Sequence, residues 1–243
     1  ALGYVASALG VVAAAIANAH FLTTISSTDN VNDKKDANIK IDAMFIHPFE
    51  QTGMIMEKPV GIYLESTKNA LPLTQTKKFD HKAWATNYEI KKPGVYKFFV
   101  EPQPYFEPAE EKYISHVPKI IVSAFGVEDG WDEPLGLKYE IIPMVKPFAL
   151  YSGNLFQGKV LHDGKPASNI EVEVELYNEF GLKAPSEAHI TQVVKTDDNG
   201  VFSFVMNHKG WWGFAALIEE GEKDFEGKKY PIENGALLWL KAY

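Results

Sequence analysis

Short segments with the two-residue period of β-strands, separated by turn-forming residues, recur along most of this chain. Residues 170–176 (IEVEVEL) alternate strictly between apolar and charged side chains, the pattern of a strand with one buried face. Residues 92–94 (KPG) and 197–200 (DDNG) are typical of tight turns, and we expect Asn199-Gly200 to adopt a type I′ turn. Because no segment after residue 19 shows sustained helical periodicity, the sequence predicts an all-β fold.

The expected strands form two groups, on either side of a stretch punctuated by Pro143, Pro147 and Gly153. They are residues 39–45, 60–64, 84–90, 95–100 and 120–125, and then 156–161, 170–177, 189–195, 201–206, 211–218 and 236–240. We predict two antiparallel β-sandwich domains, residues 20–150 and 151–243, and a polar loop at residues 23–38. The second half, with its GKVLHDGKP, DDNGVFSF and GWWGFAAL segments, resembles transthyretin-like or carboxypeptidase-regulatory-like sandwiches.

The uncharged apolar run 1–19 ends in Ala17-Asn18-Ala19, a small-x-small sequence of the kind that signal peptidase cleaves. The run is also long enough to hold the protein on a membrane as an anchor helix. Either outcome predicts an exported protein of the cell envelope, periplasmic if cleaved and attached to the inner membrane if not. Cleavage would make His20 the first residue, and its α-amine and ring could then chelate a metal together.

The amino-acid composition limits the partners and metal ligands that this protein can use. A net charge of −8 argues against nucleic acid, which needs a basic surface. The absence of cysteine leaves histidine and carboxylates as the main metal ligands, a set that suits Ni²⁺, Co²⁺, Cu²⁺ or Zn²⁺ according to geometry. Phosphate-loop, Gly-x-Ser-x-Gly and HExxH motifs are absent, which argues against nucleotide chemistry and acyl transfer.

Polar residues that suit a metal site gather in the first half. His47 and Glu50 lie three apart on a turn stiffened by Pro48, and a proline- and glutamate-rich segment, residues 101–111, precedes His116. The predicted ligands are His20, His47, His116, Glu50 and Glu107. The predicted supporting residues, which would orient the ligands, are Tyr105, Glu101, Glu140 and Trp131. A hydrogen-bonded loop at His47 and a solvated acidic loop at residues 101–111 remain the alternatives.

Several motifs carry a resemblance when they are taken in order. They are residues 19–21 (AHF), 47–50 (HPFE), 101–116 (EPQPYFEPAEEKYISH), 130–143 (GWDEPLGLKYEIIP), 149–160 (ALYSGNLFQGKV), 191–204, 210–217 and 235–239. This set is similar to an exported bacterial family described as the periplasmic component of cobalt/nickel uptake systems, of the DUF4198 type. The resemblance implies a periplasmic Ni²⁺- or Co²⁺-binding protein without turnover, not an enzyme, that supplies a membrane permease of the energy-coupling-factor type.

Two other functions remain open. An N-terminal histidine with a second histidine on a β-sandwich also resembles the copper histidine brace of lytic polysaccharide monooxygenases, with Tyr105 or Phe106 as the axial residue. The third possibility is a membrane-anchored structural or adhesive sandwich without metal.

Overall fold

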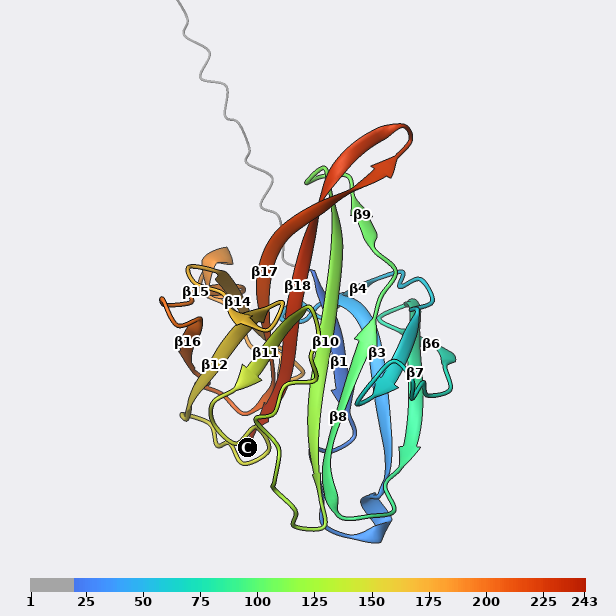
Figure 1. Ribbon diagram of the computed structural model, residues 1–243, viewed down its shortest axis with the longest axis vertical. Coiled ribbons are helices and arrows are strands. Elements are labelled where there is room, and N and C mark those ends of the chain that lie inside the picture. Colours follow the sequence, from blue (N-terminus) through green and yellow to red (C-terminus); the bar gives the residue numbers. More distant parts are fainter. Residues whose placement is uncertain (1–19) are drawn as a thin grey trace, which may run out of the picture.

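The computed structural model describes residues 20–243, and the predicted leader or anchor, residues 1–19, lies outside them (Figure 1). The described residues form strands and two short 3-10 turns, η1 (Lys34–Asp36) and η2 (Glu187–His189). The all-β, sandwich-type prediction is therefore confirmed. Within residues 20–243 no helix has the length and apolar character needed to cross a membrane.

The strands form three sheets. Sheet A, in the order β1-β3-β7-β6 with β4 on β3, contains β1 (Phe21–Ser26), β3 (Asn38–His47), β4 (Thr52–Met54), β6 (Thr74–Lys78) and β7 (His81–Glu89). Sheet B, the largest, contains β2 (Asn30–Val31), β5 (Gly61–Leu64), β8 (Gly94–Glu101), β9 (Tyr105–Glu107), β10 (Lys112–Ala124), β14 (Glu171–Leu176), β15 (Gln192–Lys195), β17 (Gly210–Phe225) and β18 (Lys228–Ala242). Sheet C contains β11 (Tyr139–Pro143), β12 (Leu155–His162), β13 (Lys165–Pro166) and β16 (Val201–Val205).

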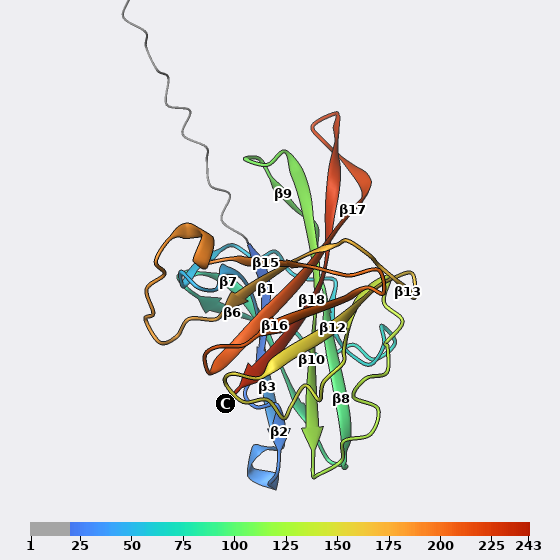
Figure 2. The same cartoon turned by 90° about the vertical axis from the view of Figure 1, so that its left-hand side faces the viewer.

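Sheet B is covered on both faces, with sheets A and C on opposite sides of its long strands (Figures 1 and 2). In β17, Trp212 and Phe214 belong to the core shared with sheet C, whereas the alternate residues Trp211 and Ala215 belong to the core shared with sheet A. This alternation follows from the two-residue period of a strand. Strands from both sides of the predicted boundary at residues 150 and 151 meet in sheet B, and the division into two domains stays a prediction.

The expected loop at residues 23–38 is wrong over its first part. Strand β1 pairs with β3, and Thr23, Thr24 and Ser26 are buried. The Thr23 and Ser26 hydroxyls donate hydrogen bonds to nearby backbone carbonyls, at 3.3 and 2.7 Å, so both buried hydroxyl groups have hydrogen-bond partners. Threonine is β-branched and packs well in a strand, so a polar composition does not exclude a core strand here.

The turn at residues 197–200 is present, but the type I′ geometry is wrong. Gly200 has φ +77°, whereas Asp198 and Asn199 are not among the residues with positive φ. The Asp197 carboxylate accepts hydrogen bonds from the backbone N–H groups of Asn199 and Val201. The turn joins β15 of sheet B to β16 of sheet C, and therefore does not have to match the twist of a two-stranded hairpin.

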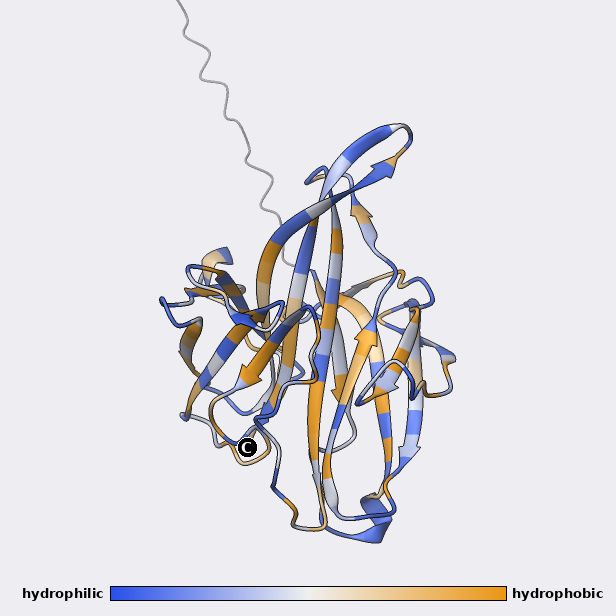
Figure 3. Cartoon of the chain, viewed as in Figure 1, coloured by the Kyte–Doolittle hydropathy of each residue, from blue (hydrophilic) through white to orange (hydrophobic). Residues whose placement is uncertain are grey.

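The β17–β18 hairpin extends beyond the body of the protein (Figure 1). Its inner part is apolar and buried, whereas its tip is hydrophilic and exposed (Figure 3). The tip packs against the β9–β10 hairpin, where Phe106 stacks on Phe225 with 4.1 Å between ring centroids. These two hairpins frame the end of the A–B sandwich at which the candidate site lies.

Candidate metal centre

Two of the predicted histidines meet because of strand register. In the β1–β3 ladder Phe21 pairs with Ile46, so the preceding residue, His20, stands opposite His47. The two imidazole centroids lie 4.3 Å apart. The His20 side chain is only 13% exposed, so its ring is held inside the sandwich rather than in solvent.

The third histidine reaches the same place from sheet B. His116 of β10 pairs with Gly235 of β18 and is 4% exposed. The missing side chain of Gly235 makes room for the ring, since a Cβ there would lie 2.4 Å from His116 Cδ2. The Nε2 atom of His116 lies 3.3 Å from Glu233 Oε2, while its buried Nδ1 has no hydrogen-bond partner.

Carboxylates surround these rings. Glu107 Oε2 lies 3.7 Å from His20 Nδ1. The remaining acidic groups come from β14, from β18 and from the turn before β10, and they line a cavity of about 160 Å³ together with two of the histidines. Its lining residues are His20, Glu110, Lys112, Ile114, His116, Glu173 and Glu233.

Burial and neighbouring charges set the protonation of this cluster. Burial, followed by the nearby His47 and His116, lowers the pKa of His20 to about 4, so its ring is neutral at neutral pH. Burial opposes ionisation of Glu233, but hydrogen bonds from His116 and Lys112 outweigh it and lower its pKa to about 2. Burial and the charge of Glu233 raise the pKa of Glu173 to about 7. A neutral imidazole beside an ionised carboxylate is the form that binds a divalent cation.

Lys112 is the positive charge within the cavity. Its ammonium group pairs with Glu110 and, at 2.7 Å, with Glu233. Burial acts against the charged form, but these two hydrogen bonds raise the pKa of Lys112 to about 12. The lysine offsets part of the acidic charge, and a divalent ion entering the cluster would compete with it for Glu233.

The structure brings together four of the five predicted ligands, His20, His47, His116 and Glu107, but not Glu50. Glu50 lies in the turn after β3 and lines a shallow pocket with Gln51 and residues 178–190. Glu50 is near enough to Glu175 to contribute to raising its pKa, but it is not among the residues of the cavity that His20 and His116 line. Its proposed role as a ligand is therefore not supported by its position.

The predicted supporting residues lie in different places. Tyr105 contacts Phe45, with 5.1 Å between ring centroids, beside the cluster. Glu101 ends β8, where it pairs with Gly61 of β5. Trp131 packs against the core between sheets B and C, away from the histidines.

Glu140 was expected to orient a ligand histidine, and this expectation is wrong. Its carboxylate accepts a hydrogen bond of 2.6 Å from Lys119 Nζ, and both side chains are 1% exposed. It also accepts hydrogen bonds from the backbone N–H groups of residues 135–137. Glu140 therefore holds a loop and a buried lysine between sheets B and C.

Glu233 and Glu173 were missed from the sequence. The alternation of residues 170–176 indicates glutamates on a solvent-facing side, but sheet A covers that face of sheet B, and Glu175 is 1% exposed. Glu233 was missed because the expected last strand begins at Ala236, whereas β18 begins at Lys228. Only the pairing of β10 with β18 brings Glu233 beside His116.

Glu175 gives a prediction about pH and stability. Its carboxylate accepts hydrogen bonds of 2.9 Å from Phe49 N–H and Thr191 Oγ1–H, while burial raises its pKa to about 8, with smaller contributions from Glu173 and Glu50. The folded state therefore binds this proton more tightly than the unfolded chain, and the stabilisation present below about pH 4.5 is lost as pH rises toward 8.

Glu175→Gln keeps the shape of the side chain and removes this titration. We expect the variant to be more stable than the wild type at pH 8, by on the order of 2 kcal/mol, and to differ much less at pH 5. Urea unfolding at the two pH values measures this difference. An equal difference at both pH values would contradict the assignment to Glu175.

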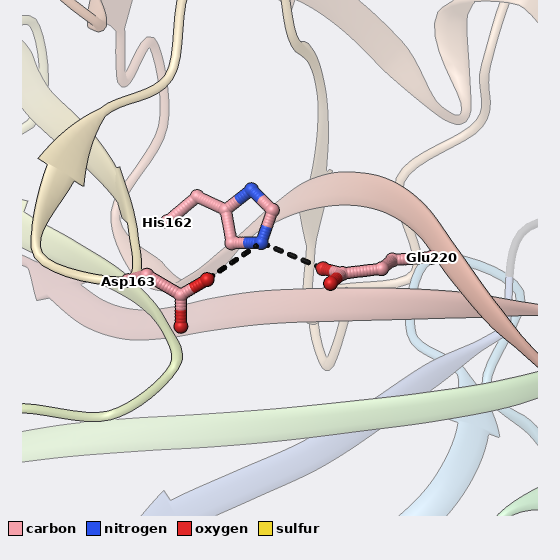
Figure 4. Close-up of side chains that lie close together, drawn as sticks. All are labelled: His162, Asp163 and Glu220. Atoms are coloured by element: carbon pink, nitrogen blue, oxygen red, sulfur yellow. Dashed lines mark ion pairs between the residues drawn. The ribbon is translucent and has the colours of Figure 1, made fainter.

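A second cluster lies on the surface. Among residues 20–243, three possible ligand atoms approach within 4.8 Å of one another only in His162, Asp163 and Glu220 (Figure 4). His162 Nε2 lies 2.6 Å from Glu220 and 3.4 Å from Asp163, and the Glu220 carboxylate also accepts hydrogen bonds from Tyr139 and Lys138.

The surface cluster is the weaker candidate for a metal. It offers one imidazole rather than three, its side chains are 33–64% exposed, and both Glu220 oxygens already have donors. In the A–B sandwich His116 is buried and the His20 side chain is 13% exposed. A nitrogen without a hydrogen-bond partner does not separate the two clusters, because both His116 Nδ1 and His162 Nε2 lack one. The ligand atoms in the A–B sandwich lie farther apart, so a bound ion would draw them inward. We therefore define His20, His47, His116, Glu107 and Glu233 as the candidate metal centre.

The fold and the site together define an all-β protein of stacked sheets with a buried histidine–carboxylate cluster at one end. The sequence profile of DUF4198, a domain of unknown function, matches residues 17–220. The chain therefore belongs to the DUF4198 family, whose description assigns no activity. No curated protein matches the sequence significantly.

Several solved structures share a distant likeness. They include the D0-D1 domain of intimin (13% identity, 92% of this chain and 100% of that chain, TM-score 0.24) and a putative membrane-anchored protein from Corynebacterium diphtheriae (11%, 90% and 58%, TM-score 0.26). A third is the Yersinia pseudotuberculosis adhesin InvE (10%, 88% and 58%, TM-score 0.24). Identities and TM-scores this low carry no functional argument.

Proposed function

We propose that this protein is an exported metal-binding protein that takes up Ni²⁺ or Co²⁺ at the candidate metal centre and supplies it to a membrane uptake system. The observation that carries the proposal is the meeting of three histidines, His20 just before β1, His47 of β3 and His116 of β10, with an unpartnered Nδ1 on the buried His116. Buried polar atoms are normally hydrogen-bonded, so an imidazole nitrogen without a partner is available to a ligand, a property that His162 Nε2 shares.

The donor set supports a borderline divalent ion. Imidazole nitrogens favour Ni²⁺, Co²⁺, Cu²⁺ and Zn²⁺ over Mg²⁺ and Ca²⁺, which prefer oxygen. The carboxylates of Glu107 and Glu233 balance the charge of the ion and orient the rings. Among these ions the proposal takes Ni²⁺ or Co²⁺ from the resemblance to uptake-system proteins, and Cu²⁺ remains chemically compatible.

The proposal also includes the export of this protein and the membrane permease that receives its metal. The apolar run 1–19 supports secretion to the periplasm or attachment to the inner membrane. The receiving partner would be a permease of the energy-coupling-factor type. A protein that releases its metal to a permease needs a site near its surface, which agrees with a centre at the end of a sandwich rather than in its middle.

A calorimetric titration of the protein with metal ions tests the proposal. We expect the protein to bind one Ni²⁺ or Co²⁺ with a Kd below about 10 µM, and Mg²⁺ at least a hundredfold more weakly. The absence of Ni²⁺, Co²⁺ and Cu²⁺ binding below about 10 µM would overturn the proposed function. The protein has no cysteine, so thiol oxidation cannot disturb the measurement.

The start of the chain gives a further prediction. A protein beginning at His20 is expected to bind Ni²⁺ at least tenfold more tightly, about 1.4 kcal/mol, than one that retains residues 1–19. The reason is that the free α-amine adds a second donor from the same residue. The same protein with its His20 α-amine acetylated is the matched control, since acetylation removes the amine as a donor and supplies no second amine. Equal affinities would show that His20 acts through its ring alone.

A further inference from the structure

An apolar cavity of about 270 Å³ adjoins the candidate metal centre. It lies between β3 and the segment that carries β9 and β10, and its walls include Phe45, Met56, Tyr105 and Phe106. Such a volume is just below the roughly 300–1,000 Å³ usual for small-molecule pockets. It fits one small ring compound and is too small for a folded segment or a lipid.

The apolar cavity and the metal centre are neighbours that share walls. His116 and Ile114 line both the apolar cavity and the polar one. The His20 ring lies 5.6 Å from the Phe45 ring, which in turn lies 5.1 Å from Tyr105. A ligand bound at the histidines would therefore have a polar surface on one side and an aromatic surface on the other.

A hydrated ion alone does not account for this aromatic surface. Water ordered against apolar walls lacks the two to four polar partners that hold buried water, so an apolar cavity favours an apolar occupant. The carboxylates of Glu107, Glu110 and Glu233 would repel an anionic organic molecule that arrived without its metal. A small chelator that carries a divalent ion satisfies both surfaces.

We propose that the metal enters as a complex with a small aromatic chelator, whose donor atoms hold the ion at His20 and His116 while its ring occupies the apolar cavity. This inference rests on the proposed function, since it names the form in which the metal is bound. By linkage, the ring and the ion strengthen each other's binding by the same factor.

Two nickel complexes of equal charge separate the contribution of the ring. Pyridine-2-carboxylate and glycinate each bind Ni²⁺ through one nitrogen and one carboxylate oxygen, and only the first carries an aromatic ring. We expect the wild-type protein to bind the 1:1 nickel–pyridine-2-carboxylate complex at least tenfold more tightly than the glycinate complex. Pyridine-2-carboxylate without nickel is expected not to bind.

A substitution at the mouth of the apolar cavity tests the location. Ile55 lines the cavity and is 55% exposed, so Ile55→Trp fills the space from outside without entering the core. Val193→Trp is the matched control, because Val193 is 52% exposed and lies on β15, outside this cavity. We expect Ile55→Trp to abolish the preference for the aromatic complex, and Val193→Trp to retain it, with equal affinity for Ni²⁺ alone.

The outcomes separate this inference from the proposed function. Equal affinity of the wild type for both complexes, with Ni²⁺ itself still bound, would overturn the inference and leave the proposed function standing. A preference that Ile55→Trp does not reduce would overturn the assignment to this cavity. Failure of every form of Ni²⁺ to bind would overturn both.

Discussion

Replacing His20, His47 or His116 by alanine is expected to weaken Ni²⁺ binding at least tenfold each, about 1.4 kcal/mol per variant. Each substitution removes one of three imidazoles that meet between sheets A and B. Calorimetric titration of the three single variants measures the effect. His116→Ala is expected to lose most, because its ring is 4% exposed and its Nδ1 has no partner within the protein.

Stability measurements separate lost ligands from lost packing. His20→Ala and His47→Ala are expected to unfold at nearly the wild-type urea concentration, since both lie at strand ends. His116→Ala leaves space beside Gly235, so its affinity is interpreted together with its unfolding curve.

His162→Ala is the matched control for the metal titration, since it removes the single histidine of the surface cluster. We expect it to bind Ni²⁺ like the wild type. Loss of binding in His162→Ala, with binding retained in His20→Ala and His116→Ala, would place the metal at the surface cluster instead.

The second large effect concerns the stability of the fold. Glu140→Leu is expected to lower the free energy of unfolding by about 3–5 kcal/mol, because it leaves the ammonium of Lys119 buried without its partner. The same change also removes the acceptor for three backbone N–H groups, those of residues 135–137. Urea unfolding monitored by tryptophan fluorescence measures the loss.

The two halves of this ion pair are not equivalent. Lys119→Met is expected to cost less than Glu140→Leu, because Glu140 would keep its three backbone donors. The double variant should recover part of the loss, which a double-mutant cycle quantifies. Glu171→Leu on β14 is the control, since Glu171 is exposed. A cost below about 1 kcal/mol for Glu140→Leu would show that the buried lysine finds another partner or loses its proton.

Local patterns in the sequence were sufficient for the fold class but not for all of its strands. Alternation at residues 170–176 predicts β14 because strand periodicity is a property of neighbouring residues. The strand at Phe21–Ser26 was missed because its threonines and serine read as a loop. They are buried only because β1 is enclosed between β3 and the strands of sheet B.

The residues of the candidate site were likewise only partly predictable from the sequence. Residue type and chain position were enough to select His20, His47, His116 and Glu107. Glu50 and Glu140 were selected on the same grounds and lie elsewhere, since spacing along the chain does not fix the direction of a side chain after a turn. Glu233 and Glu173 join the site only through the pairing of β14, β17, β18 and β10.

The sequence by itself determined that this protein is all-β and that any metal site in it must use histidine and carboxylate ligands rather than thiolate. Both follow from local periodicity and from the side chains present. Only the tertiary structure decided which of those side chains meet. Sheet B pairs strands far apart in the chain and is covered on both faces, which buries His116, half-buries Glu173 and brings both toward His20. Long-range strand pairing is a collective property of the packed core, and no short stretch of sequence carries it.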